Sequence, residues 1–168
     1  LGTLPGDIGV PILVVQHITP GFTAGLAEWL TQATRLSVKV AQPRDPVRRG
    51  TVYLAPDRSQ MGITQGGRIH LTEEVVEGGL CPSASHLFQS VAETYGRSAI
   101  GILLTGMGRD GATGLRRLRE AGGLTIAQDE ESSIIFGMPG EAIRVGAAEY
   151  VLSPEQIAEL IRSLVGVQ

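Results

Sequence analysis

Short apolar runs alternate along this chain with segments of helical periodicity. The run at 11–16 is continuously apolar and rich in β-branched residues, which is the pattern of a strand covered on both faces in a parallel sheet. Further strands are predicted at 36–41, 99–105, 124–127 and 149–152. The order of these runs indicates a sheet with helical crossovers rather than a meander of hairpins.

Apolar residues between these strands recur at helical spacing. The pattern predicts helices at 22–34, from Pro82 onward, after Gly111, at 138–145 and at 154–165. In the first of these helices, Phe22 and Trp29 belong to the apolar stripe that we expect to be buried. Capping residues mark other helices: Ser153 is the expected N-cap of the last helix, and Ser83 is expected to cap the start of the second. The exposed face of the third helix is predicted from Arg116, Arg117, Arg119 and Glu120.

The segment 51–72 interrupts this alternation. Strand-like runs at 51–55 and 68–72 flank turn residues and a further short run near 61–64, which predicts an antiparallel excursion. The charged, glycine-containing segment 73–80 predicts a surface loop. The sequence therefore predicts an α/β fold of three layers, doubly wound, with a mostly parallel sheet and an antiparallel hairpin near 51–72.

Composition narrows the possible functions. The 168 residues are 42% apolar, which suits one domain spanning 1–168. A net charge of −3 and an aromatic content of 4% provide neither a basic surface nor a base-stacking surface, so we expect no nucleic-acid partner. Cys81 is the single cysteine, and no Cys/His set has zinc spacing, so we expect no metal and a reducing, cytoplasmic compartment. The apolar runs are far shorter than the ~20 residues that span a bilayer, so no membrane insertion is expected.

Two polar segments follow predicted parallel strands directly. Gln16-His17 comes after the first strand, and Gly106 to Gly111 comes after the strand that ends at Thr105. Ligands of open parallel sheets bind beyond the carboxyl ends of the strands. These two segments are therefore the candidate site.

His17 and Asp110 are the candidate catalytic side chains. An imidazole can take a proton from a nucleophile while a carboxylate holds the ring in the correct tautomer, so His17 would be the general base and Asp110 its orienter. The alternatives are a hydrogen-bonded structural histidine and an aspartate that caps the following helix. Spacing alone does not decide between these roles.

Gly106, Gly108 and Gly111 allow the backbone to approach a ligand closely. The backbone N–H of Met107 could serve as an oxyanion donor, and the same loop could instead cradle a phosphate. The segment lacks the Lys-Ser/Thr ending of a P-loop, and no dinucleotide fingerprint is present.

Six segments, taken in order, resemble the signature blocks of CheB methylesterase domains. They are PILVVQHITPGFT at 11–23, GTVYLAP at 50–56, LFQSVA at 87–92, LLTGMGRDG at 103–111, AGGLTIAQDE at 121–130 and FGMP at 136–139.

The resemblance implies hydrolysis of glutamate methyl esters on the cytoplasmic helices of chemoreceptors, and in some members deamidation of glutamine. It implies a Ser-His-Asp triad in which His17 is the histidine, Asp110 the aspartate and Met107 the oxyanion residue, flanked by Gly106 and Gly108. It implies no metal or organic cofactor. Candidate fusion partners in the parent protein are a phosphorylated receiver domain and a methyltransferase.

The nucleophile departs from the family pattern. In the family the serine lies in a Gly-Ala-Ser-Thr/Ala-Gly-Gly turn after a strand, upstream of the segment that 1–7 resembles. We therefore expect the nucleophile and its strand to lie outside this chain, which by itself would be inactive. The cluster of Cys81, Ser83, Ser85 and His86 is a poor substitute, because adjacent residues on a helix point about 100° apart.

Three functional hypotheses remain at this point. The first is an esterase whose serine lies upstream. The second is a non-catalytic module that keeps the scaffold to bind receptors or signalling partners. The third is an anion- or nucleotide-binding domain that uses the loop 106–111.

Overall fold

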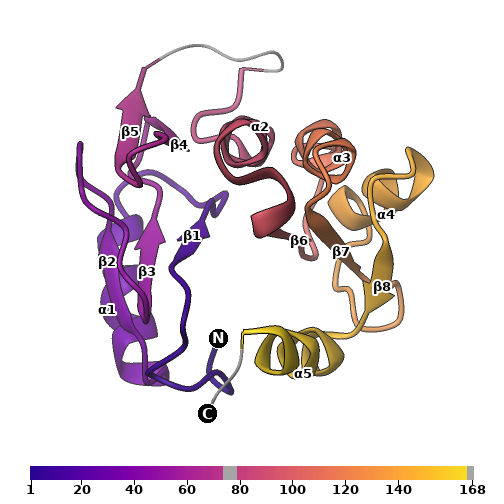
Figure 1. Cartoon of the computed structure of the whole chain (residues 1–168), viewed down its shortest axis with the longest axis horizontal. Helices are drawn as coiled ribbons and strands as arrows, with labels where there is room; N and C mark the ends of the chain where they lie inside the picture. Colours follow the sequence, from indigo (N-terminus) through magenta and orange to yellow (C-terminus); the bar gives the residue numbers. More distant parts are fainter. Residues whose placement is uncertain (74–78, 166–168) are drawn as a thin grey trace. The chain divides into compact units, whose positions relative to one another are not determined.

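The computed structural model describes residues 1–73 and 79–165, which form two compact units (Figure 1). The first unit comprises 1–82 and 158–168, and the second comprises 83–157. Each unit contains a parallel sheet of three strands.

The parallel sheet of the first unit has the order β1-β3-β2. Its strands are β1 (Ile12–Val14), β2 (Ser37–Val40) and β3 (Thr51–Leu54). Leu54 is paired with Val14 on one side and with Val40 on the other, so the three strands end at the same level. The loops that follow them therefore begin along one edge of this sheet.

Helix α1 (Thr23–Ala33) packs against β2 beside the sheet (Figure 1). The helix is where the periodicity predicted it, but the expected burial of Phe22 and Trp29 is wrong. Phe22 is 63% exposed and Trp29 is 61% exposed, whereas Thr23 and Ala27 are buried. The buried Thr23 directly follows Phe22, so its side chain lies about 100° around the helix from the one expected to be buried.

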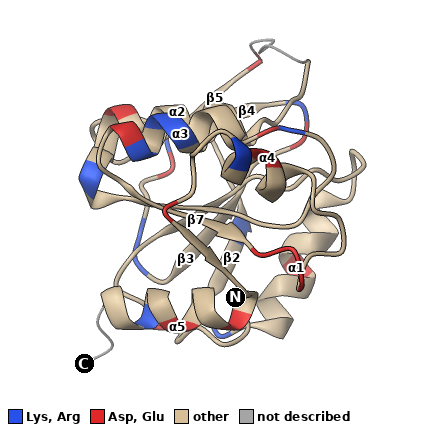
Figure 2. Cartoon of the chain, turned by 90° about the vertical axis from the view of Figure 1, so that its right-hand side faces the viewer, with Lys and Arg blue, Asp and Glu red and all other residues tan. Residues whose placement is uncertain are grey.

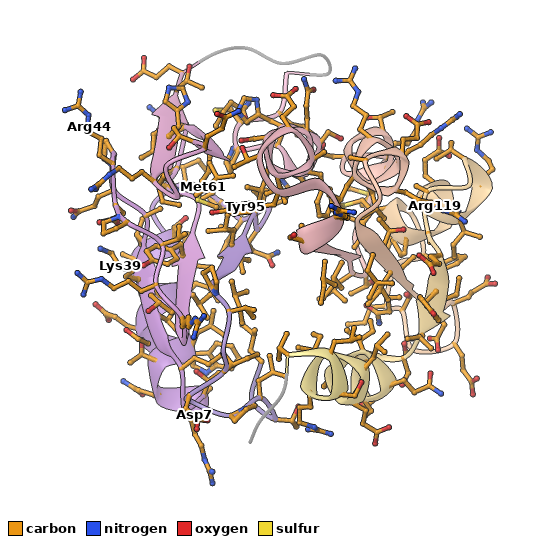
Figure 3. All side chains as sticks on the ribbon, in the orientation of Figure 1. Asp7, Lys39, Arg44, Met61, Tyr95 and Arg119 are labelled. Carbon is orange, nitrogen blue, oxygen red and sulfur yellow. The ribbon has the colours of Figure 1, made fainter. Side chains whose placement is uncertain are left out.

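The predicted antiparallel excursion is confirmed as the pair β4 (Gln60–Ile63) and β5 (Ile69–Thr72). Met61 of β4 is fully buried, and Figure 3 labels it. The preceding run at 51–54 is not part of this pair, because as β3 it is the central strand of the parallel sheet.

Helix α5 (Pro154–Leu164) crosses the boundary between the two units. The hydroxyl of Ser153 accepts a hydrogen bond from the Gln156 N–H at 3.4 Å, which confirms Ser153 as its N-cap. From Ala158 onward the helix belongs to the first unit, where Ala158 packs in one core cluster with Ile8 and Val52.

The parallel sheet of the second unit has the order β6-β7-β8. Its strands are β6 (Ile100–Leu103), β7 (Leu124–Gln128) and β8 (Tyr150–Leu152). Its helices are α2 (Ala84–Tyr95), which a 3₁₀ turn at Gly96–Ser98 follows, α3 (Ala112–Glu120) and α4 (Met138–Arg144). Strands that alternate with helices in parallel pairing confirm the predicted α/β class.

Helices α2 and α3 approach each other closely at Gly114. A Cβ atom at this position would lie 2.5 Å from the carbonyl oxygen of Ser85 and 2.6 Å from its Cα. Leu115 and Leu118, on the buried face of α3, are fully buried. Only glycine therefore permits this distance between the two helices.

The exposed face of α3 carries the predicted charges, and one of them has a structural role. Arg116 pairs with Glu120 at 3.0 Å while both side chains stay more than half exposed. Arg119, labelled in Figure 3, donates to the carbonyl oxygens of Gly146 at 2.7 Å and Ala148 at 3.2 Å. Arg119 therefore ties α3 to the loop between α4 and β8.

Helix α5 carries charges of both signs (Figure 2), with Glu155 and Glu159 preceding Arg162. Within the described residues, none of the helices has the length and apolar character needed to cross a membrane.

Substitution of the third residue of α3 and of α1 should have opposite effects. Gly114→Ala should lower the free energy of unfolding by about 1–3 kcal/mol, because the added methyl group meets backbone atoms of α2. Gly25→Ala should raise it by about 0.5–1 kcal/mol, because a Cβ there meets no atom within 4 Å and alanine favours the helix. Urea unfolding measures both, and equal effects would contradict the close approach at Gly114.

Candidate active site

The candidate residues of the first unit lie beyond the carboxyl end of β1. His17 is exposed on the loop that joins β1 to α1. The start of this loop is held by the Ala55 N–H, which donates to the Val14 carbonyl at 2.9 Å. A turn closes its far half, where the Phe22 N–H donates to the Thr19 carbonyl at 3.2 Å. An imidazole on such a loop is held by the sheet yet accessible to a ligand.

The candidate residues of the second unit lie beyond the carboxyl end of β6. Gly106 forms an isolated parallel bridge with Phe136. Its N–H donates to the Ile135 carbonyl at 3.1 Å, and its carbonyl accepts from the Met138 N–H at 2.8 Å. A Cβ at Gly106 would lie 2.5 Å from the Met138 sulfur, so a larger residue would displace the Met138 side chain.

The backbone N–H of Met107, the predicted oxyanion donor, belongs to a peptide unit whose orientation is fixed. The peptide unit between Gly106 and Met107 is fixed by the hydrogen bond that its carbonyl accepts from Met138. In a trans peptide the N–H points away from the carbonyl, so this N–H is directed away from Met138. No described residue accepts a hydrogen bond from it. Met107 as a whole residue is 81% exposed.

Asp110 occupies the N-terminus of a neighbouring helix. Its carboxylate accepts hydrogen bonds from the Ser83 hydroxyl at 2.8 Å, the Ala84 N–H at 2.6 Å and the Ser85 N–H at 3.1 Å. The alternative that Asp110 caps its own helix is wrong, because the N-cap of α3 is Gly111 and no side chain caps it. The three donors and the positive end of the α2 dipole suit an ionised carboxylate in a fixed orientation.

Ser83 and Ser85 have structural roles at the same helix start. The Ser83 hydroxyl accepts from the His86 N–H at 3.3 Å, which confirms the predicted N-cap. The Ser85 hydroxyl accepts from the Gly111 N–H at 2.8 Å and lies 3.3 Å from the Thr113 hydroxyl. Burial and the charge of Glu73 raise the pKa of the Cys81 thiol, which disfavours its nucleophilic thiolate form.

Sequence reasoning missed Gln128, which holds the start of the Gly106 loop by a hydrogen bond. Gln128, at the end of β7, is 3% exposed. Its carbonyl oxygen accepts from the Thr105 N–H at 2.8 Å, and its amide donates to the Ser132 carbonyl at 2.9 Å. A glutamine directly after the apolar run 124–127 is the sequence feature that could have indicated this role.

The predicted site residues thus fall into two groups. Gly106, Met107, Gly108 and Asp110 share one loop of the second unit, and His17 lies in the first unit. Their joint action stays a prediction. Among the described residues, no group of three or more His, Cys, Asp or Glu side chains is arranged to hold a metal ion.

Comparison with known proteins relates this chain to a family of methylesterases. Residues 1–161 match the family model described as CheB methylesterase. The chain is 49% identical over 166 residues to protein-glutamate methylesterase/protein-glutamine glutaminase 1 of Syntrophus aciditrophicus, covering 99% of this chain and 47% of the relative. It is 50% identical over 165 residues to the protein of the same name, without a number, from Nitrosospira multiformis, covering 98% and 46%. The chain therefore spans about half the length of the curated relatives it matches.

A solved structure matches more completely. The crystal structure of the Thermotoga maritima CheB methylesterase catalytic domain superposes with a TM-score of 0.92 at 37% sequence identity. The match covers 97% of this chain and 88% of that one. The α/β fold predicted from the sequence is thus also confirmed by a related solved structure.

Replacement of Asp110 should destabilise the protein through α2. In Asp110→Asn one of the two acceptor oxygens becomes an amide that faces N–H donors, so the free energy of unfolding should fall by about 1–3 kcal/mol. The exposed Glu120→Gln serves as a control and should change it by less than about 0.5 kcal/mol. Urea unfolding that gives the same value for both variants would contradict the role of Asp110 at α2.

Proposed function

The chain belongs to the CheB methylesterase family, and from this premise we propose that it forms the catalytic region of an enzyme that hydrolyses glutamate methyl esters on chemoreceptors. The reaction releases methanol and restores the glutamate carboxylate. The structural observation that carries the proposal is the fixed peptide between Gly106 and Met107, whose N–H is available to an oxyanion.

In this proposal His17 takes the proton of a serine hydroxyl as the oxygen attacks the ester carbonyl. Asp110, held by the start of α2, orients the imidazole and stabilises its protonated form. The Met107 N–H donates to the oxygen that becomes negatively charged. Collapse of the tetrahedral intermediate breaks the bond to the methoxy group, and the proton on His17 goes to methanol.

Water then completes the cycle. It gives a proton to His17 and attacks the acyl-enzyme, which releases the glutamate carboxylate and returns the proton to serine. A glutamine amide can follow the same course with ammonia as the leaving group. The names of the two relatives include a glutaminase activity, and we extend that second activity to this site.

The nucleophilic serine lies upstream of this chain in the proposal. The resemblance places it in a glycine-rich turn after a strand that precedes the segment matching 1–7. Ser83 and Ser85 are unsuitable substitutes, because their hydroxyls already serve the starts of α2 and α3. The 168 residues alone should therefore release no methanol.

The substrate and the cellular setting follow from the same premise. We propose that the enzyme acts in the cytoplasm on the helices of chemoreceptors that carry the methylated glutamates. A receiver domain or a methyltransferase in the parent protein would connect this activity to signalling.

Removal of either proposed catalytic side chain should abolish turnover. The test uses the chain together with the upstream segment that carries the serine, and measures methanol release from methylated receptor. His17→Ala and Asp110→Asn should each lower kcat by about 10⁴-fold. His70→Ala, which alters an exposed residue of β5, is the matched control and should retain activity. Absence of activity in the unaltered protein with its serine intact would refute the proposed function.

Two substitutions should separate the contribution of the Met107 N–H to kcat from that of the Met107 side chain. Met107→Pro removes the N–H and should lower kcat by about 10²- to 10³-fold. Met107→Leu keeps the N–H, so its effect should be much smaller. Equal kcat values for these two variants, with circular dichroism showing both folded, would rule out this N–H as the oxyanion donor.

A further inference from the structure

The structure contains a second aspartate that serves the loop carrying His17. Asp57 lies three residues after the end of β3 and is half-buried. Its carboxylate accepts a hydrogen bond from the Gly21 N–H at 2.6 Å and another from the Thr23 hydroxyl. Both partners lie at the end of the loop that begins after β1 and contains His17.

The segment after β3 therefore holds this loop at both ends. At the start of the loop, the Ala55 N–H donates to the Val14 carbonyl at 2.9 Å. At its end, Asp57 binds Gly21 and Thr23. His17 lies between these two attachments, only three residues after Val14. The backbone on both sides of His17 is thus attached to the segment that follows β3.

The carboxylate of Asp57 also places a negative charge and a hydrogen-bond acceptor at the N-terminus of α1. The N-cap of α1 is Phe22, which has no side-chain cap, and the first turn contains no acidic residue. A negative charge is favoured at a helix N-terminus, and Asp57 provides it from another part of the chain. The hydrogen bonds from Thr23 and Gly21 hold the pKa of Asp57 below its ordinary value, so the group is charged at neutral pH.

We propose that Asp57 is a positioning residue, which holds the loop between Val14 and Thr23 so that the imidazole of His17 is ready for proton transfer. The inference rests on the proposed role of His17 as general base. Asp57 itself touches no reacting atom. It differs from a simple helix cap because its loss changes His17 as well as stability.

The first test requires no enzymatic activity. Nitrogen NMR of the 168-residue chain observes only three imidazoles, and His17→Gln identifies the signals of His17. Asp57→Asn should shift and broaden the His17 signals, because a weaker acceptor releases the loop. Thr23→Val removes one donor while keeping the side-chain shape, and should give a smaller change in the same direction. It also provides a second variant if Asp57→Asn does not fold.

Asp45→Asn is the matched control. Asp45 also follows a strand of this sheet, accepts from a backbone N–H, that of Gln42 at 2.9 Å, and pairs with Lys39 at 2.8 Å. Its pKa is likewise lowered, although burial opposes the effect of Lys39 and Gln42. The His17 signals should stay in place in this variant, since none of its partners lies in the loop after β1.

The second test measures turnover in the protein that includes the serine. Asp57→Asn should lower kcat by about 10- to 100-fold with KM unchanged, because misplacement of a general base affects the chemical step. A folded Asp57→Asn variant with wild-type His17 signals and wild-type kcat would overturn the inference. If the wild-type enzyme shows no activity, the proposed function fails, while the NMR comparison still decides whether Asp57 positions His17.

Discussion

Parallel hydrogen bonding between strands is the constraint on which the rest of this structure depends. Because paired strands run in one direction, their carboxyl ends lie at one edge of each sheet, as the register of Val14, Leu54 and Val40 shows. The hydrogen bonds between strands therefore fix the position at which each following loop begins. His17 and Asp57 follow two such strands, and the Gly106 loop follows a third in the other unit.

Carboxylates at these edges serve the N-termini of helices that lack acidic residues of their own. Neither α1 nor α2 has an acidic residue in its first turn. Asp57 provides a negative charge for α1, and Asp110 provides one for α2. In both cases the bond links a strand-end loop to a helix elsewhere in the chain. The same contact therefore stabilises the helix and fixes the loop that the proposed chemistry requires.

Glycine allows the backbone to take part directly in the candidate site. At Gly106 a side chain would collide with Met138, and at Gly114 it would collide with the backbone of α2. The Gly106 carbonyl accepts from the Met138 N–H, which fixes the peptide that presents the Met107 N–H, and Gly114 lies where α3 meets α2, the helix whose N-terminus Asp110 binds. Stability and the proposed function thus both depend on the close packing at Gly106 and Gly114.

The sequence by itself determined the order of strands and helices, the α/β class and the strand-end location of His17 and of the loop 106–111. These features depend on local periodicity and on turn residues, both of which can be read from residues that are close together in the sequence. The family resemblance also followed from ordered local motifs, and the comparisons confirmed it.

Tertiary structure alone decided which partners the polar groups have and which helix face is buried. The periodicity of α1 located an apolar stripe, yet close packing on the sheet buried Thr23 and Ala27 and left Phe22 and Trp29 exposed. Asp110 bonds to residues about 26 positions away, and Asp57 to residues about 35 positions away. Periodicity describes one element at a time, whereas these contacts depend on how separate elements pack together, so local sequence could not specify them.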